Sequence, residues 1–86
     1  MRGMDTNDLR TLSRVLVFGT DATRRALALR MAAVPDPEFS RVLGETVRSS
    51  EPEDVRGRCR EVLGIMADAG DPFASGVLDE LSAAPA

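Results

Sequence analysis

Apolar residues recur along this chain at intervals of three and four positions, which is the spacing of one face of an α-helix. Glycine, proline and capping residues interrupt the pattern and divide it into five predicted helices. Their expected ranges are 6–18, 20–34, 36–48, 52–69 and 71–82. No stretch shows the period-two alternation and β-branched residues of a strand. We therefore predict an all-α fold of five short antiparallel helices.

Each predicted helix carries an apolar stripe that we expect to face the core of the protein. These stripes consist mostly of small aliphatic side chains, and the chain has only three aromatic residues. Such a core suits closely packed helices better than a deep aromatic pocket. The expected core-facing residues are Leu9, Leu12, Val15 and Leu16; Ala22, Ala26, Leu29 and Ala33, widened by Leu27 and Met31; Phe39, Val42, Leu43 and Val47; Val55, Cys59, Val62, Leu63 and Met66; and Phe73, Val77, Leu78 and Leu81.

Two of the predicted helices begin with the same motif, D-P-x4-V-L-x-E. It runs from Asp36 to Glu45 and again from Asp71 to Glu80, thirty-five positions later. In both copies we expect the aspartate to cap the helix and the proline to occupy its first turn. Repeats of about 20 to 50 residues indicate a stacked architecture, in which neighbouring units bury each other's apolar faces.

The other turns carry comparable signals. Thr20 or Asp21 is expected to cap the second helix. Ser50 and Glu53 have the spacing of a capping box for the fourth helix. Gly70 is expected to end that helix.

Four glycines lie inside predicted helices, where each costs roughly 1 kcal/mol relative to alanine. Two of them, Gly57 and Gly64, lie seven positions apart on one face of the fourth helix. We expect their missing side chains to let a neighbouring helix come close. The alternative is a chain of marginal stability that folds fully only when a partner binds.

The predicted fourth helix and the turns beside it resemble a HEAT or HEAT-like repeat. Glu51-Pro52-Glu53-Asp54-Val55-Arg56, Cys59 and Leu63-Gly64 resemble the second helix of such a repeat. Gly70-Asp71-Pro72 resembles the join to the next repeat. The resemblance implies about two and a half helical hairpins, stacked as a right-handed α-solenoid or a small helical bundle. It also implies that the chain holds another macromolecule.

The length of 86 residues suits one small domain, which we expect at 5–82 with flexible termini at 1–4 and 83–86. The formal net charge of −3 argues against a strong sequence-independent attraction to nucleic acid. With one cysteine and no histidine the usual zinc sites cannot be assembled, so we expect no cofactor. No apolar run approaches the roughly 20 residues that cross a bilayer, and no secretory signal is evident. The expected location is the cytoplasm.

No residue pattern predicts catalysis. Cys59 lies on an apolar stripe, and we expect a buried thiol with no base beside it. Glu51, Glu53 and Asp54 lie at the start of a helix, where capping and the helix dipole account for them. We therefore predict that the chain is not an enzyme.

All eleven basic residues are arginines. Most have a carboxylate three or four positions away, and such pairs stabilise a helix by roughly 0.2–0.5 kcal/mol each. The expected pairs are Asp21 with Arg24 and Arg25, Glu53 with Arg56, Asp54 with Arg58, and Arg41 with Glu45. The candidate partner-binding residues, on a groove lined by the second and fourth helices, are Arg24, Arg30, Arg56 and Arg60, of which Arg30 and Arg60 lack an obvious carboxylate.

The function expected from these features is a non-enzymatic protein–protein interaction or regulatory module, with another protein as its partner. A stack of about two and a half repeats leaves ends with little to cover them. Val17, Phe18 and Phe73 are therefore candidates for self-association into a homodimer.

The alternative is a small helix-turn-helix DNA-binding transcriptional regulator. The segment from Leu27 to Val34, a turn, and the segment from Phe39 to Leu43 are similar to that motif. Asp36 and Glu38 would present the wrong charge to phosphate, so binding to nucleic acid is not expected.

Overall fold

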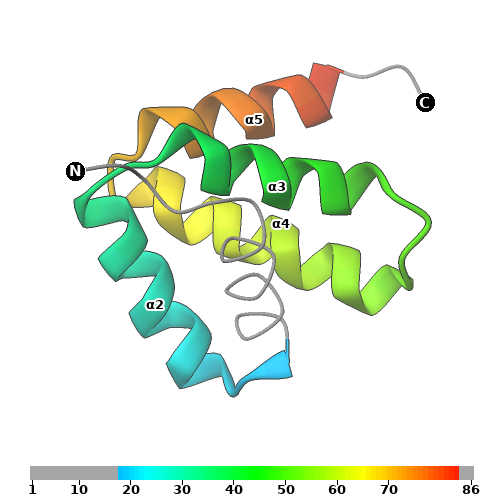
Figure 1. Cartoon of the computed structure of the whole chain (residues 1–86), viewed down its shortest axis with the longest axis horizontal. Helices are drawn as coiled ribbons and strands as arrows, with labels where there is room; N and C mark the ends of the chain where they lie inside the picture. Colours follow the sequence, from blue (N-terminus) through cyan, green and yellow to red (C-terminus); the bar gives the residue numbers. More distant parts are fainter. Residues whose placement is uncertain (1–17, 84–86) are drawn as a thin grey trace.

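The computed structural model describes residues 18–83, and within that range it contains helices and no strand. Its helices are α2 (Asp21–Ala33), α3 (Pro37–Arg48), α4 (Glu53–Asp68) and α5 (Pro72–Ala83) (Figure 1). The predicted all-α fold is confirmed for these residues. The predicted first helix lies outside them except for Phe18, as do the predicted flexible termini except for Ala83, which ends α5.

The caps of α2 and α3 are formed as their sequences predict. The Thr20 hydroxyl accepts a hydrogen bond from the backbone N–H of Thr23 at 3.1 Å. The Asp36 carboxylate accepts one from the backbone N–H of Glu38 at 2.9 Å, with Pro37 in the first turn. Both side chains thereby satisfy an N–H group that the helix leaves without an internal partner.

The predicted capping box at the start of α4 is wrong. The residue before the helix is Pro52 in an extended conformation, and no side chain caps the first turn. Ser49 instead organises this turn, because its hydroxyl donates to the Thr46 carbonyl and accepts from the backbone N–H of Glu51.

The turn from α4 into α5 is a Schellman motif in which Asp71 serves both helices. Gly70, at a φ of 99°, ends α4 as its sequence predicts, and its N–H donates to the Ala67 carbonyl. The Asp71 N–H donates to the Met66 carbonyl at 3.0 Å. Its Oδ1 accepts from the backbone N–H groups of Phe73 and Ala74 at 2.9 and 3.2 Å, which caps α5.

α4 is the central helix of the described fold, because it packs against α2, α3 and α5. α3 and α5 run in the same direction and pack against each other, and α4 runs antiparallel to both (Figure 1). The two Asp-Pro turns therefore lie at the same end of the molecule, on the left in Figure 1. α2 packs against α4 alone among the described helices.

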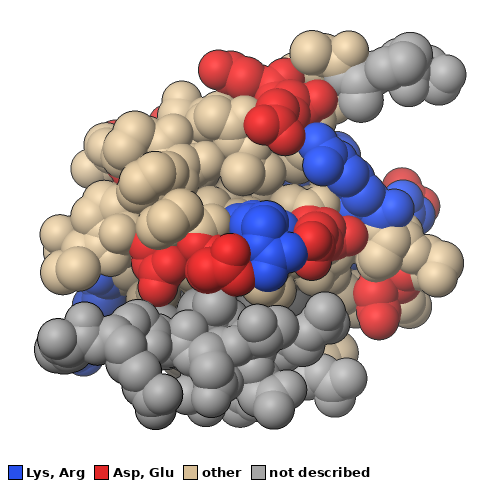
Figure 2. Space-filling view, turned by 45° about the horizontal axis from the view of Figure 1, so that its top comes forward, with Lys and Arg blue, Asp and Glu red and all other residues tan. Residues whose placement is uncertain are grey.

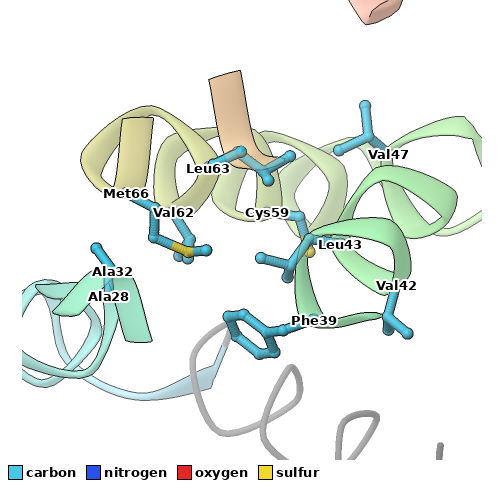
Figure 3. Close-up of a cluster of buried hydrophobic side chains, with 11 residues drawn as sticks. Ala28, Ala32, Phe39, Val42, Leu43, Val47, Cys59, Val62, Leu63 and Met66 are labelled. Atoms are coloured by element: carbon cyan, nitrogen blue, oxygen red, sulfur yellow. The ribbon is translucent and has the colours of Figure 1, made fainter. Parts of the chain in front are cut away.

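The core is centred on α4, as Figure 3 shows. The predicted inward positions of α3 are confirmed, and so are those of α4 except Val55, which is half-buried. α5 contributes Ala74, with Val77, Leu78 and Leu81 half-buried against the cluster. The buried apolar side chains are Ala28, Ala32, Phe39, Val42, Leu43, Val47, Cys59, Val62, Leu63, Met66 and Ala74.

The predicted inward stripe of α2 is wrong at its four principal positions, whereas Leu27 and Met31, predicted to widen it, are half-buried against the core. Ala22, Ala26, Leu29 and Ala33 are exposed, and the buried residues of this helix are Arg24, Ala28 and Ala32. Alanine lies on both sides of α2, so the two sides differ little in hydrophobicity. Tertiary packing, rather than amphipathic contrast, decides which side faces α4.

The predicted close approach at Gly57 and Gly64 is also wrong. Among residues 18–83, a Cβ atom added at either position would meet nothing within 4 Å. The close contact occurs at Gly44 of α3, where a Cβ atom would lie 2.7 Å from Cγ1 of Val77 on α5. Gly44 therefore allows the backbones of these two helices to approach.

Candidate functional site

The side of α2 that points away from α4 is apolar. It carries Ala22, Ala26, Leu29 and Ala33, which follow one another at intervals of four, three and four residues. That spacing aligns their side chains on one side of a helix. All four are exposed, and we refer to them as the outward face of α2.

Large exposed apolar side chains gather on and beside this helix. The large hydrophobic residues exposed within residues 18–83 are Phe18 at 69%, Leu29 at 43%, Val34 at 78% and Phe73 at 41%. Phe18 precedes the N-cap of α2 by two residues, and Val34 directly follows the helix. Three of the four therefore belong to α2 or its ends. Phe73 lies exposed in the first turn of α5 and not in the core, and Phe18 is also exposed, as their candidacy for self-association requires.

Two arginines flank the outward face of α2. Arg25 immediately precedes Ala26 and Arg30 immediately follows Leu29, which puts the two guanidinium groups on opposite sides of the apolar row. Both residues are exposed, and neither has an ion pair or a side-chain hydrogen bond within the described part of the chain. Arg30 also lies in the last turn of α2, where the helix dipole favours a cation.

Arg24 does not lie on the surface, as a partner contact would require. Its side chain is buried, with only 4% of the residue exposed. One of its nitrogens donates to the Gly19 carbonyl at 2.7 Å, and another donates to the Asp21 carboxylate. The predicted pairing with Asp21 is confirmed, and it ties the preceding turn to α2 instead of holding a partner.

The other predicted contacts do not join Arg30 in one strip. Arg56 is half-buried, and its Nε donates to the Glu51 carbonyl at 2.9 Å, which holds the turn before α4. Arg60 is exposed and lines a shallow depression of about 200 Å³ with Leu78, Leu81 and Ser82. The last turn of α2 and the first turn of α4 lie towards opposite ends of the molecule (Figure 1).

The exposed side of α3 is mixed in charge. Arg41 donates to both Glu38 and Glu45, and its pairing with Glu45 confirms the predicted pair. The hydrogen bond with Glu38 raises the pKa of Arg41 and lowers the pKa of Glu38. On the face shown in Figure 2, arginine side chains lie beside carboxylates, so that the surface is mixed in charge. α2 and α3 also do not pack against each other, although the helices of a helix-turn-helix do.

Cys59 is fully buried, as its place on the apolar stripe of α4 predicts. Burial, with a smaller contribution from the charge of Glu51, raises the pKa of its thiol to about 11. The thiol is therefore protonated at neutral pH and is a small apolar side chain, since only the thiolate is a good nucleophile.

The described residues contain no group of three or more cysteine, histidine or acidic side chains arranged to hold a metal ion. Within residues 18–83 we also find no helix with the length and apolarity that a membrane crossing requires. The chain matches no family model, no curated protein and no solved structure.

The four residues of the outward face of α2 and the flanking Arg25 are missing from the sequence-based set of site residues. Leu29 is assigned to the core, because its stripe is as regular as the one that is buried. Arg25 is assigned to a local pair with Asp21, whereas Asp21 bonds to Arg24. The sequence does carry one signal for Arg25. Arg24 and Arg25 both lie near Asp21, and when Asp21 pairs with one of them, the other has no local carboxylate.

Proposed function

We propose that this chain is a non-enzymatic protein–protein interaction module and that the outward face of α2 is its binding surface. The observation that carries the proposal is the position of α2 at the edge of the fold. This helix packs on one side against α4 and exposes an apolar row on the other. The proposal assigns no catalytic residue and no cofactor.

Apolar surface on α2 and at its two ends is left in contact with water. Leu29, with Phe18 and Val34 beside the helix, exposes area that would gain about 25 cal/mol per Å² on burial. Single exposed apolar residues are ordinary, whereas a regular row of exposed apolar residues along one side of a helix, as on α2, is typical of an interaction site. Alanine at the other positions leaves room for a partner helix at the 8–10 Å separation of packed helices.

We further propose that the fold is a short HEAT-like stack in which α3 and α5 are equivalent first helices and α2 and α4 are second helices. Three features support this: the repeated Asp-Pro motif begins both α3 and α5, these helices run in the same direction, and α2 packs on α4. The junction between α2 and α3 differs from the junction between α4 and α5, because α4 packs against α5 whereas α2 does not pack against α3. In this arrangement α2 is the second helix of the first repeat and packs on α4 of the next repeat, and its outward face is exposed.

DNA binding has less support than protein binding. The exposed side of α3, the presumed reading helix, surrounds Arg41 with Glu38 and Glu45. Both carboxylates would repel the phosphate backbone, and Arg41 would have to leave them to contact it.

The test is site-specific photo-crosslinking in the cells that make the protein. A photoreactive residue replaces Leu29 on the outward face of α2, and in a matched control it replaces Glu61, an exposed residue of α4. The proposal predicts an adduct of one defined mass from position 29 and none from position 61. The protein in that adduct, once identified, should bind the purified chain and lose binding to the Leu29→Asp variant.

Equal adducts from positions 29 and 61 would contradict the proposal, and so would a partner that binds Leu29→Asp as tightly as the native chain. The melting temperature of Leu29→Asp is measured in parallel. It should lie close to that of the native chain, because Leu29 lies outside the buried core and an aspartate there costs mainly its helix propensity.

A further inference from the structure

We infer that the outward face of α2 binds an acidic amphipathic helix of another protein and not the same face of a second copy. The inference rests on the proposed function and adds the chemistry of the partner. It follows from two features of α2: the heptad spacing of its exposed apolar row and the two arginines that flank that row.

The exposed row has the spacing of a coiled-coil seam. Ala22, Ala26, Leu29 and Ala33 occupy positions d, a, d and a of a heptad repeat. A helix with this seam packs against a second helix at a shallow crossing angle, with side chains of one inserted between those of the other. The occupant that fits an apolar row of this form is therefore an α-helix with its own apolar seam.

The flanking arginines determine the charge of the occupant. With the seam at a and d, Arg25 falls at position g and Arg30 at position e. These positions face the e and g residues of a partner helix and set partner choice through charge. Because neither guanidinium has an ion pair among the described residues, both are free to pair with glutamate or aspartate on the partner.

The same geometry disfavours pairing with a second copy of α2. In a parallel pair, position g of one helix faces position e of the other, so Arg25 would oppose Arg30 twice. In an antiparallel pair, g faces g and e faces e, so each arginine would oppose its own equivalent. Like charges at these positions destabilise the pair. Asp21, the sole acidic residue of α2, falls at position c and pairs with Arg24, so it is not placed between the e and g arginines to relieve this repulsion.

The size of the side chains in the seam points the same way. Three of the four seam residues are alanines, so two copies would meet with little apolar surface between them. A partner with leucine at its own a and d positions would fill that space and cover Leu29. The outward face of α2 is thus suited to a partner that supplies both the larger apolar side chains and the acidic charge.

The test uses two synthetic three-heptad peptides that share leucine at every a and d position. One peptide carries glutamate at all e and g positions, and the other carries lysine. Binding to the full chain is measured by fluorescence anisotropy, and the site is mapped by amide chemical-shift changes. We expect the glutamate peptide to bind about five- to tenfold more tightly than the lysine peptide. Arg25 and Arg30 would each form an attractive pair with glutamate where each would repel lysine. The shifts should be confined to α2 and its two ends.

Charge reversal provides the matched control. The variant Arg25→Glu/Arg30→Glu should reverse the preference in favour of the lysine peptide, whereas Arg60→Glu, an exposed arginine on α4, should leave it unchanged. Raising the salt to about 1 M, where the Debye length is about 3 Å, should reduce the difference between the peptides.

Equal affinities for the two peptides, or shifts away from α2, would overturn the inference. So would a concentration-dependent dimer of the native chain that Leu29→Asp abolishes, because the second copy would then be the occupant. In either case an adduct from position 29 would leave the proposed function standing. The absence of that adduct would remove the proposed function itself, so the two failures are distinguishable.

Discussion

Gly44 of α3 and Val77 of α5 mark a point of close approach between these two helices. A Cβ atom at Gly44 would lie 2.7 Å from Val77 Cγ1, closer than real Cβ atoms approach other side chains. Both residues belong to the repeated segment that begins with Asp-Pro, and the two helices that carry it run side by side in the same direction (Figure 1). A residue without a side chain is therefore required at this crossing.

The first prediction follows from that contact. Gly44→Ala should destabilise the fold by about 1–2 kcal/mol, because overpacking at Val77 outweighs the roughly 1 kcal/mol that alanine contributes in a helix. Gly57→Ala is the matched control, since its Cβ atom meets nothing within 4 Å in the described part of the chain, and it should stabilise the fold by up to about 1 kcal/mol. Urea unfolding followed by circular dichroism measures both changes.

A double variant tests the stated cause. In Gly44→Ala/Val77→Ala the Val77 methyl groups are gone, so the loss of stability should be smaller than the sum of the two single losses. Additive losses, or a Gly44→Ala variant as stable as the native chain, would mean that α3 and α5 do not approach closely here.

The second prediction compares the two Asp-Pro caps. Asp71→Ala should cost about 1–2 kcal/mol, because the fully buried Asp71 Oδ1 accepts from two backbone N–H groups. Asp36→Ala should lower the stability by only about 0.5–1 kcal/mol, because Asp36 is half-buried and its carboxylate accepts from one backbone N–H group. Thermal unfolding of the two variants measures the difference.

The variant Asp71→Ser distinguishes the capping hydrogen bonds of Asp71 from the effect of its buried charge. Asp71→Ser keeps an acceptor for the first turn of α5 and removes Oδ2, which is buried without a hydrogen-bond partner among the described residues. We expect Asp71→Ser to retain more stability than Asp71→Ala. If the alanine variant at position 36 proved the less stable of the two alanine variants, the buried role of Asp71 would be refuted.

The third prediction concerns pH and Cys59. Its thiol has a pKa of about 11 in the folded chain, against an ordinary value of 9.0. Above pH 9 the unfolded chain loses the thiol proton while the folded chain keeps it, so the free energy of unfolding should fall as the pH rises towards 11. Below pH 9 the contribution of Cys59 should be constant.

The composition of the chain makes this effect easy to isolate. It has no lysine, tyrosine or histidine, and arginine titrates above pH 12, so Cys59 is the one side chain that titrates between pH 9 and 11. Cys59→Ala should lower stability by leaving a cavity but should show no fall in this range. If the free energy of unfolding of the native chain and of Cys59→Ala changed in the same way between pH 9 and 11, a raised pKa of the Cys59 thiol would be excluded.

The helix boundaries of the described residues could be predicted from local signals, because local chemistry determines them. Thr20, Asp36 and Gly70 act at the ends of helices through hydrogen bonds within a few residues. The inward faces of α3 and α4 were also predictable, because each carries large apolar residues on one side and charges on the other.

The orientation of α2 could not be predicted in the same way. In the hydrophobic pattern of α2, a charged residue is expected to face water, which places Arg24 outside and Leu29 inside. Arg24 is buried instead, because the Gly19 carbonyl and the Asp21 carboxylate accept hydrogen bonds from its guanidinium. With Arg24 buried towards α4, Leu29 lies on the opposite side of the helix and is exposed. The spacing of apolar residues alone does not encode how α2 is rotated against α4.

The most direct test of this orientation, and of the surface proposed on it, compares Ala26→Asp with Ala28→Asp. The two alanines lie two positions apart in α2, Ala26 on the exposed side and Ala28 fully buried. Thermal unfolding should show Ala26→Asp within about 1 kcal/mol of the native chain, since an exposed aspartate costs only its helix propensity. Ala28→Asp should lose several kcal/mol by burying an unpaired charge. Equal losses, or the reverse order, would mean that the row from Ala22 to Ala33 faces the core and is no binding surface.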